Sequence, residues 1–356
     1  MITAILFFWL ALQTVSPEGA QHMQAGLEAH KQGHFDVAIK EFRKATETDP
    51  TFVDAFLDLG VVYLETRDYA SATTALKHAL QLNPELDAAH QQLGYALLAQ
   101  GYAEEAIPHL ERVHELAALG IAQIETGHFE EAVVNLDAVL KKNPNDPDLL
   151  YYMGRASGLL SKKANDILVT AFPDSARAHQ TMGENYFVLR QMPQAEKEYL
   201  EAIRQRPDLP DVHMELGLVY AGSAEWTKAE EVFRTEVKLQ PGKAEAFYRL
   251  GFALLQQGKG REARLELQHA DKLQPDMPET LYSLGKAASL EGDTALAEKS
   301  WLHLLSIEKD SSLSAQAHFG LAALYRKAGN AEKAKQEIQE YQKLQAKPAD
   351  GGTPQP

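Results

Sequence analysis

The chain has 356 residues, of which 45% are hydrophobic, with 50 acidic and 35 basic side chains and a formal net charge of −15. An acidic chain has no global field that draws it to nucleic acid or anionic lipid, so the charge favours basic or neutral partners. The absence of cysteine excludes disulfides, thiolate metal sites and cysteine nucleophiles, and it leaves the redox compartment open.

Residues 1–18 contain an apolar run from Ile2 to Leu12. This run is shorter than the roughly 20 residues of a membrane-spanning helix, but it has the length of a signal-peptide core. No Lys or Arg precedes it and no small-x-small cleavage site comes before Gln21, so a misassigned start and an interfacial anchor stay open beside export. We predict an exported protein in the periplasm or outside the cell, with a cytoplasmic location as the alternative, and leave open whether the segment is cleaved.

From residue 19 to about residue 346 the sequence repeats itself with a period close to 34. Aligned segments such as QLGY, TMGE, ELGL and RLGF place a small residue at one position of each repeat. These ten residues are Gly26, Gly60, Gly94, Gly120, Gly154, Gly183, Gly217, Gly251, Gly285 and Ala322. A fixed period of this length is typical of a stacked repeat architecture.

Three further positions recur at fixed offsets from the small residue. An alanine follows after twelve residues, and a bulky apolar residue follows after sixteen, in every repeat except the fifth, where Asp166 and Thr170 stand instead. The bulky residues are Phe42, Leu76, Leu110, Leu136, Tyr199, Phe233, Leu267, Trp301 and Ile338. Six repeats then close on Pro50, Pro84, Pro144, Pro207, Pro241 or Pro275, where the missing amide proton ends a helix. Glycines at 33, 101, 127, 258, 292 and 329 are placed to end the first helix of their repeats in the left-handed conformation.

This combination of offsets resembles the tetratricopeptide repeat family, of exported bacterial type. The resemblance implies an all-α chain of ten antiparallel helix pairs, stacked as an α-solenoid in a right-handed superhelix, in which the small residues let the two helices of a pair approach. The predicted segments are the signal-like residues 1–18, repeats 1–3 over 19–112, repeats 4–5 over 113–175, repeats 6–10 with a capping helix over 176–346, and a disordered tail over 347–356.

Two intervals are short, which marks residues 113–175 as an irregular joint. Eight residues are missing between Gly94 and Gly120, and the stretch from Glu104 to Glu125 is either one helix or two helices joined by a tight kink. We read Pro108 as lying near the start of its helix, where it need not end the element. Five residues are missing before Gly183, which predicts a short second helix in repeat 5, ended by Pro173.

No enzyme motif that we searched for is complete in the sequence. His114 and Glu115 begin an HExxH pattern, but Ala118 occupies the place of the second His, and no phosphate-binding loop or GxSxG elbow is present. The 13 histidines are scattered, and His90, His179 and His213 recur at one place in the first helix, which indicates packing. His22, Glu28, His30 and His34 form the densest group, and we interpret the three histidines as surface residues near a turn rather than as metal ligands. We therefore predict no catalytic, cofactor or metal site and no enzymatic activity.

In the tetratricopeptide repeat family, which this sequence resembles, the first helices line the concave side of the solenoid, where partners bind. Helical spacing places aromatic, methionine and cationic side chains there, the types that dominate interface energetics. The predicted groove residues are Tyr95, Tyr151, Arg155, Arg177, Phe187, Met214, Tyr248, Phe252, Tyr282, Lys286, Phe319 and Arg326. The alternative is that these aromatics pack between adjacent first helices and that the cations are solvated. Asn185 is the lone asparagine of these helices, so the Lys and Asn set that grips a peptide carboxylate in one subtype is missing.

The sequence thus predicts a non-catalytic scaffold that binds an extended or helical protein segment in this groove, without nucleic acid, cofactor or integral membrane span. A self-assembling homo-oligomer is the alternative, and an enzyme comes third. The identity of the partner, the pathway and the oligomeric state stay open.

Overall fold

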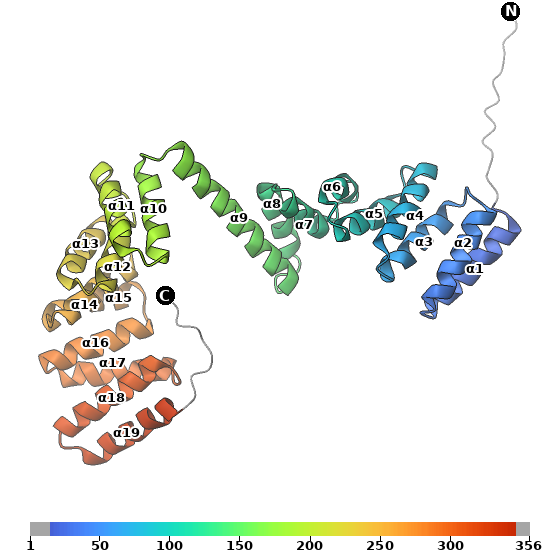
Figure 1. The fold of residues 1–356 in the computed structure, drawn as a ribbon. Coiled ribbons are helices and arrows are strands. Elements are labelled where there is room, and N and C mark those ends of the chain that lie inside the picture. Colours follow the sequence, from blue (N-terminus) through green and yellow to red (C-terminus); the bar gives the residue numbers. More distant parts are fainter. Residues whose placement is uncertain (1–14, 347–356) are drawn as a thin grey trace, which may run out of the picture. The chain divides into compact units, whose positions relative to one another are not determined.

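The computed structural model describes residues 15–346, which form 19 α-helices without a strand in that range (Figure 1). The apolar run from Ile2 to Leu12 and the predicted tail over 347–356 lie outside the described residues. No helix within 15–346 combines the length and the apolar character needed to cross a membrane.

The chain divides into two compact bodies, residues 1–164 and 165–356, which we call the N-terminal and C-terminal bodies. Four antiparallel helix pairs form the first, as α1 (Pro17–Lys31) and α2 (Phe35–Thr48), α3 (Val53–Glu65) and α4 (Tyr69–Leu82), α5 (Asp87–Ala99) and α6 (Ala103–Arg112), and α7 (Leu116–Glu125) and α8 (Phe129–Leu140). The dividing point falls within α9 (Pro147–Ala171).

Five further pairs form the C-terminal body, as α10 (Ala176–Val188) and α11 (Met192–Gln205), α12 (Val212–Gly222) and α13 (Trp226–Leu239), α14 (Ala244–Gln256) and α15 (Gly260–Leu273), α16 (Pro278–Glu291) and α17 (Thr294–Ile307), and α18 (Ser312–Lys327) and α19 (Ala331–Ala346). Helices α2, α4 and α11 end two residues before a repeated proline, as the sequence predicts. Each body is a stack of helix pairs, and the predicted α-solenoid fold is confirmed.

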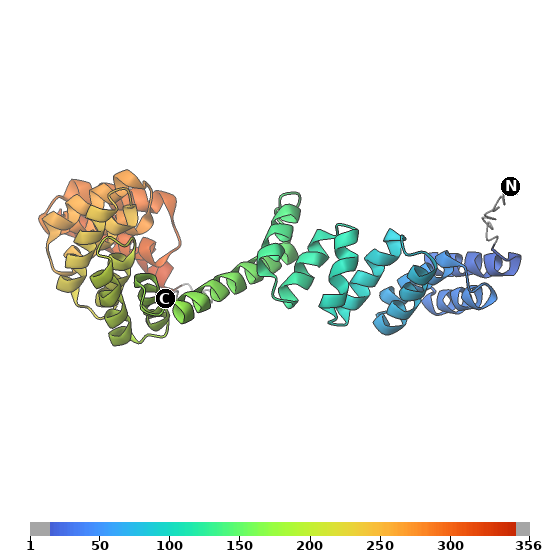
Figure 2. The same cartoon turned by 90° about the horizontal axis from the view of Figure 1, so that it is seen from above.

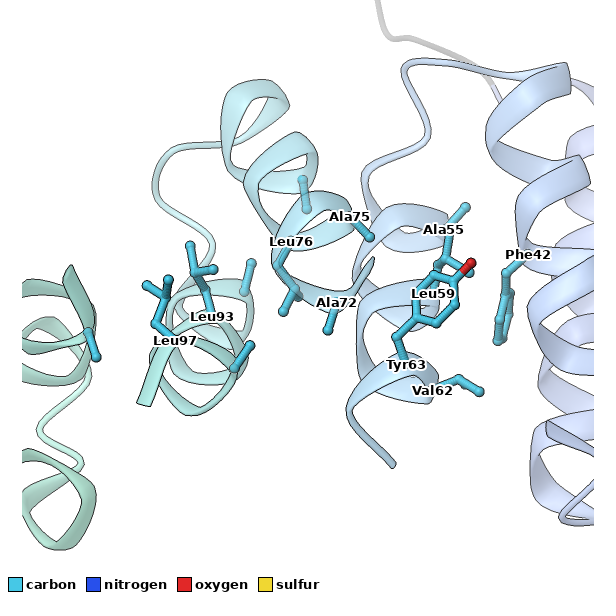
Figure 3. Close-up of a cluster of buried hydrophobic side chains, with 14 of the residues drawn as sticks. Phe42, Ala55, Leu59, Val62, Tyr63, Ala72, Ala75, Leu76, Leu93 and Leu97 are labelled. Carbon is cyan, nitrogen blue, oxygen red and sulfur yellow. The ribbon is translucent and has the colours of Figure 1, made fainter. Parts of the chain in front are cut away.

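Helix pairing depends on close contact between the small residue of the first helix and the bulky residue sixteen positions later. A Cβ placed on Gly26 would lie 2.6 Å from the ring of Phe42, and one on Gly60 would lie 2.5 Å from Leu76. Phe42, Leu76 and the repeated alanine Ala72 are fully buried in the core that Figure 3 shows between α2, α3, α4 and α5. Glycine at the contact therefore leaves the space that the bulky side chain fills.

Repeat 5 does not form a pair, which corrects the predicted count of ten. Pro147–Ala171 is one uninterrupted helix of 25 residues, visible as such in Figure 1 and Figure 2. Its Gly154 has no heavy atom within 4 Å of a built Cβ, because Asp166 and Thr170 replace the alanine and the bulky residue that would hold a returning helix. With no turn-forming sequence between Gly158 and Asp166, the first helix continues where a second should begin.

The stretch from Glu104 to Glu125 forms two helices, which resolves the alternatives that the sequence left open. Helix α6 ends at Arg112 and α7 begins at Leu116, and His114 takes a positive φ of 55° in the turn between them. The Glu115 amide donates to Leu110 O at 3.0 Å, the same pattern as the His34 amide donating to Ala29 O inside repeat 1. A turn of the kind used within repeats thus replaces the usual linker. Pro108 is the sixth residue of α6, further inside the helix than predicted, and the helix continues past it.

The turns that join the two helices of each pair need a residue in the left-handed conformation. All six predicted glycines have φ between 73° and 82°, which confirms their role. Arg67, Arg190 and Ala224 occupy the same repeat position with φ of 61°, 59° and 57°. These three repeats therefore hold a non-glycine residue in a conformation that L side chains adopt at a cost.

Candidate partner-binding surfaces

The predicted groove residues lie on first helices or on α9, and their exposure differs widely. Tyr151, Arg155, Arg177, Phe319 and Arg326 are exposed, whereas Met214 is only 4% exposed and lies in the core of the C-terminal body. The other six are half-buried, namely Tyr95, Phe187, Tyr248, Phe252, Tyr282 and Lys286. Tyr95, Tyr151 and Arg155 belong to the N-terminal body and the rest to the C-terminal body, so the set forms no single site within one body.

Three of the predicted residues share one repeat position but differ in exposure. Met214, Tyr248 and Phe319 each stand three residues before the small residue of their repeat. Successive first helices contact one another at this position, as α14 does with α16, and the Tyr248 hydroxyl hydrogen-bonds to Ser283 of α16. Phe319 belongs to the last repeat, where no further first helix follows in the described residues, and its side chain is 55% exposed. The position is a contact between repeats wherever a following repeat covers it.

An aromatic and cationic cluster lies on α14. The rings of Tyr248 and Phe252 have centroids 6.2 Å apart, and Trp226 of α13 meets Phe252 edge to face at 5.9 Å. Arg249 lies over the Tyr248 ring at 5.5 Å and keeps an ion pair with Glu245 at 3.2 Å. Burial raises the pKa of Tyr248, so its hydroxyl stays a neutral donor.

The predicted cations differ in their partners. Arg155 of α9 forms an ion pair with Glu125 of α7 at 2.9 Å, and Arg177 of α10 donates to the side-chain oxygen of Gln180. Arg326 is exposed at the end of α18. Arg155 and Arg177 are therefore already engaged within their own bodies.

A pair of carboxyl groups lies between α10 and α12. Gln180 Nε2 donates to Glu215 at 3.1 and 3.2 Å. Burial and the neighbouring charge of Glu184 raise the pKa of Glu215 to about 8. At neutral pH the Glu215 carboxyl is therefore mainly protonated.

The recurring histidines pack within their repeats, as the sequence indicates. His22 Nδ1 lies 2.7 Å from Glu41 and His179 Nδ1 lies 2.6 Å from Glu198, in each case from the first helix to the second. His318 and Glu337 repeat this contact at 2.5 Å. His90 has His109 at the same offset, and the pKa of His109 is lowered by burial and by His90. Over residues 15–346 no group of three or more His, Asp or Glu is placed to hold a metal ion.

Three cavities recur at one repeat position, and none of the twelve predicted residues lines them. Each has its floor on a first helix and its walls on that repeat's second helix and the end of the preceding second helix. The volumes are about 540 Å³ in repeat 4, 350 Å³ in repeat 2 and 240 Å³ in repeat 9. The residues that sequence reasoning missed are those of the largest cavity, Leu116, Leu119 and Val134 among them. The signal that could have found them is the eight-residue deletion just before repeat 4.

Stacked antiparallel helix pairs with this glycine contact define the architecture of a repeat scaffold. Tetratricopeptide repeat family models match residues 29–93, and also residues 181–244 and 215–278. The matched segments therefore lie in both bodies.

Curated relatives match parts of the chain. The chain is 24% identical to the Hsp70-Hsp90 organising protein of Plasmodium falciparum over 189 residues, 53% of this chain and 29% of that protein. It is 26% identical over 195 residues to Tetratricopeptide repeat protein 6 of Homo sapiens, 50% of this chain and 37% of that protein. The chain thus spans about a third of the length of these relatives.

Among solved structures, a tetratricopeptide repeat protein named YrrB, described as having an unusual peptide-binding site, is similar with a TM-score of 0.47 and 18% identity. That match covers 51% of this chain and 92% of the other. A structure of MamA matches with a TM-score of 0.44 and 21% identity over 46% of this chain and 94% of the other.

Proposed function

We propose that the protein is a non-catalytic interaction scaffold, whose C-terminal body holds an extended or helical segment of a protein partner along its first helices. The observation that carries this proposal is the cluster of Tyr248, Phe252 and Arg249 on α14, flanked by Trp226. Half-buried aromatic and arginine side chains supply most of the binding energy in protein interfaces. The tetratricopeptide repeats support a protein ligand, and relatives named Hsp70-Hsp90 organising proteins support an adaptor role.

The electrostatics of the same body favour a basic or neutral partner over nucleic acid. The Glu184 and Glu215 pair lies on neighbouring first helices, and the chain carries a net charge of −15. A cationic side chain placed beside Glu215 would favour the ionised carboxylate, so binding of such a segment would release a proton.

Crosslinking in the native cell followed by identification of the attached proteins tests the proposal, combined with the double variant Tyr248→Ala and Phe252→Ala. We expect the double variant to weaken capture of the crosslinked partner by about a hundredfold or more, since aromatic anchors contribute about 2 kcal/mol each. Tyr102→Ala is the matched control, because Tyr102 is an aromatic side chain, 54% exposed, at the start of α6 in the other body. Unchanged capture by the double variant would argue against a partner on α14.

Self-assembly is the second candidate, and Phe319 favours it. This ring is 55% exposed at the position that a following repeat covers elsewhere, and it contacts only Tyr341 of α19 among the described rings. A second copy that covers Phe319 would continue the stack. Sedimentation across a range of concentrations tests this, since a dimer that dissociates on Phe319→Glu is expected, and a monomer at all concentrations excludes it.

We further propose that the protein is exported. Ser16 caps α1, with the Gly19 amide donating to Ser16 Oγ at 3.0 Å and the Ser16 amide donating to Asp49 at 3.3 Å. Processing before Ser16 would leave this cap intact, whereas a cut after Ala20 would remove the first turn of α1. Sequencing the N-terminus of the protein isolated from its native cell tests the proposal, and a start at Met1 in the cytoplasm contradicts it.

A further inference from the structure

The cavity of repeat 4 is an apolar slot with an acidic rim. Leu116 and Leu119 of α7 form its floor, and Val134 of α8 forms one wall with 67% of its side chain exposed. Glu111, Glu130 and Glu131 surround the opening, and all three are exposed. An exposed valine beside the half-buried Leu116 and the buried Leu119 offers apolar surface that a ligand can remove from water.

The same slot exists in repeat 2, but its chemistry differs. Counted from the small residue of each repeat, Thr74 stands where repeat 4 has Val134, and Ser71 stands where it has Glu131. The preceding second helix contributes Arg43 to the repeat 2 slot, where repeat 4 has Glu111. The repeat architecture therefore supplies the slot, and the sequence of repeat 4 makes it apolar and acidic.

The deletion before repeat 4 accounts for the greater volume of this slot. Helix α6 has 10 residues, whereas α2, which borders the repeat 2 slot, has 14. The missing last turn of α6 and the short linker remove backbone that would otherwise extend along the slot. Repeat 4 is thus left with about 540 Å³ against about 350 Å³ in repeat 2.

The charge at the rim is only partly neutralised within the described residues. Glu130 pairs with Lys163 at 3.1 Å, but no basic side chain between residues 15 and 346 is recorded in an ion pair with Glu111 or Glu131. His114 is the one side chain among those that line the slot that can become cationic. A ligand that brings positive charge would supply the missing partners, and a ligand with negative charge would be repelled.

We propose that this slot is a second docking site, which binds a leucine-sized apolar side chain presented by a basic helical segment of a protein partner. The apolar side chain would pack on Leu116, Leu119 and Val134, while Lys or Arg one helical turn away on the partner would pair with Glu111 and Glu131. This site lies in the N-terminal body, apart from the proposed groove on α14.

Two synthetic peptides test the charge requirement. Both are fluorescently labelled 15-residue helices with leucine along one stripe, one with lysine and the other with glutamate at the flanking positions. Titration of the full chain followed by fluorescence anisotropy should show binding of the lysine peptide that weakens as salt rises, and at least about tenfold weaker binding of the glutamate peptide. Equal binding of the two peptides would overturn the proposal.

Matched variants at equivalent repeat positions test the location. Val134→Asp should weaken binding of the lysine peptide by about tenfold or more, because a charged group would then face the apolar ligand. Thr74→Asp introduces the same group in the repeat 2 slot and should leave binding unchanged. Because both positions are on the surfaces of second helices, circular dichroism should show an unchanged helix content for both.

Moving the repeat 4 side chains to the repeat 2 slot tests for a gain of binding as well as a loss. Glu131→Ser with Val134→Thr should abolish most binding, and Ser71→Glu with Thr74→Val, added to that variant, should restore part of it at repeat 2. A Val134→Asp protein that binds the lysine peptide as tightly as the unaltered protein would overturn the proposal. That result would leave the groove on α14 untouched, since the two surfaces belong to different bodies.

Discussion

Gly183 and Tyr199 make, in the α10 and α11 pair, the glycine contact that recurs in the other helix pairs. A Cβ on Gly183 would lie 2.6 Å from the Tyr199 ring, and that ring is 1% exposed, so neither side chain nor backbone can yield easily. Gly154 occupies the same repeat position in α9 with open space around it. Glycine is therefore needed for packing at position 183, whereas at the equivalent position 154 it only lowers helix stability.

We expect Gly183→Ala to destabilise the C-terminal body by about 1 to 3 kcal/mol, because the added methyl overpacks the helix pair. Gly154→Ala should instead stabilise α9 by about 0.5 to 1 kcal/mol, since alanine has the higher helix propensity. Urea unfolding followed by circular dichroism measures both. Equal effects of the two variants would contradict the role assigned to the contact.

Glu215 makes the stability of the C-terminal body depend on pH. Its pKa is raised to about 8 from an ordinary value of 4.5, so the folded state favours the protonated carboxyl. The stabilisation from this group is complete below about pH 4.5 and is lost as the pH rises through about 8. The loss reflects ionisation of a half-buried carboxyl beside Glu184.

We expect Glu215→Gln to remove this dependence, because glutamine can still accept from Gln180 and stays neutral. Relative to the unaltered protein, the variant should gain about 1 to 2 kcal/mol between pH 5 and pH 9. Thermal melts across that range measure the gain. Glu332→Gln changes an exposed carboxylate in the same body and serves as the control. A gain that shrinks as the pH rises would contradict the assigned direction.

At the scale of the element, the turn between α12 and α13 holds Ala224 at φ 57° where other repeats place glycine. Ala224→Gly should stabilise the protein by about 1 kcal/mol, because glycine adopts this conformation without a steric penalty. Ala221→Gly, three residues earlier in α12, removes the same methyl from a helical position and should destabilise by about 1 kcal/mol. Melting temperatures of the two variants should therefore move in opposite directions, and a shared direction would contradict the explanation.

At the scale of the whole molecule, α9 is the one repeat segment between residues 15 and 346 without a returning helix. Residues 161–167 of α9 are exposed on every side, so that part has little tertiary packing to hold it. A helical segment shorter than about 12 residues is marginal without such packing. The second half of α9 should therefore open more readily than the paired helices.

Amide hydrogen exchange measures this opening. We expect the amides of residues 161–171 to exchange at least about tenfold faster than those in the middle of α13. The irregular repeat spacing also motivates a broader hypothesis: a hinge over residues 104–175 would make exchange faster throughout that stretch than in the flanking repeats. Equal protection of α9 and α13 would contradict both expectations.

The sequence alone determined the features that depend on local pattern. The offsets of glycine, alanine and bulky residue specify which side chains meet within a pair, and the prolines and turn glycines specify where helices end. These signals predict the solenoid because each contact forms between residues about 16 positions apart. The predicted assignment of repeat 4 to a pair holds for the same reason.

Only the tertiary structure decided what happens between repeats. Tyr248 and Phe319 share a repeat position, yet Tyr248 is half-buried and Phe319 is 55% exposed, because α16 packs against the helix of Tyr248 and no further first helix follows Phe319 in the described residues. A pattern along one chain records its own spacing, but it does not record the neighbours that fill the space around each residue.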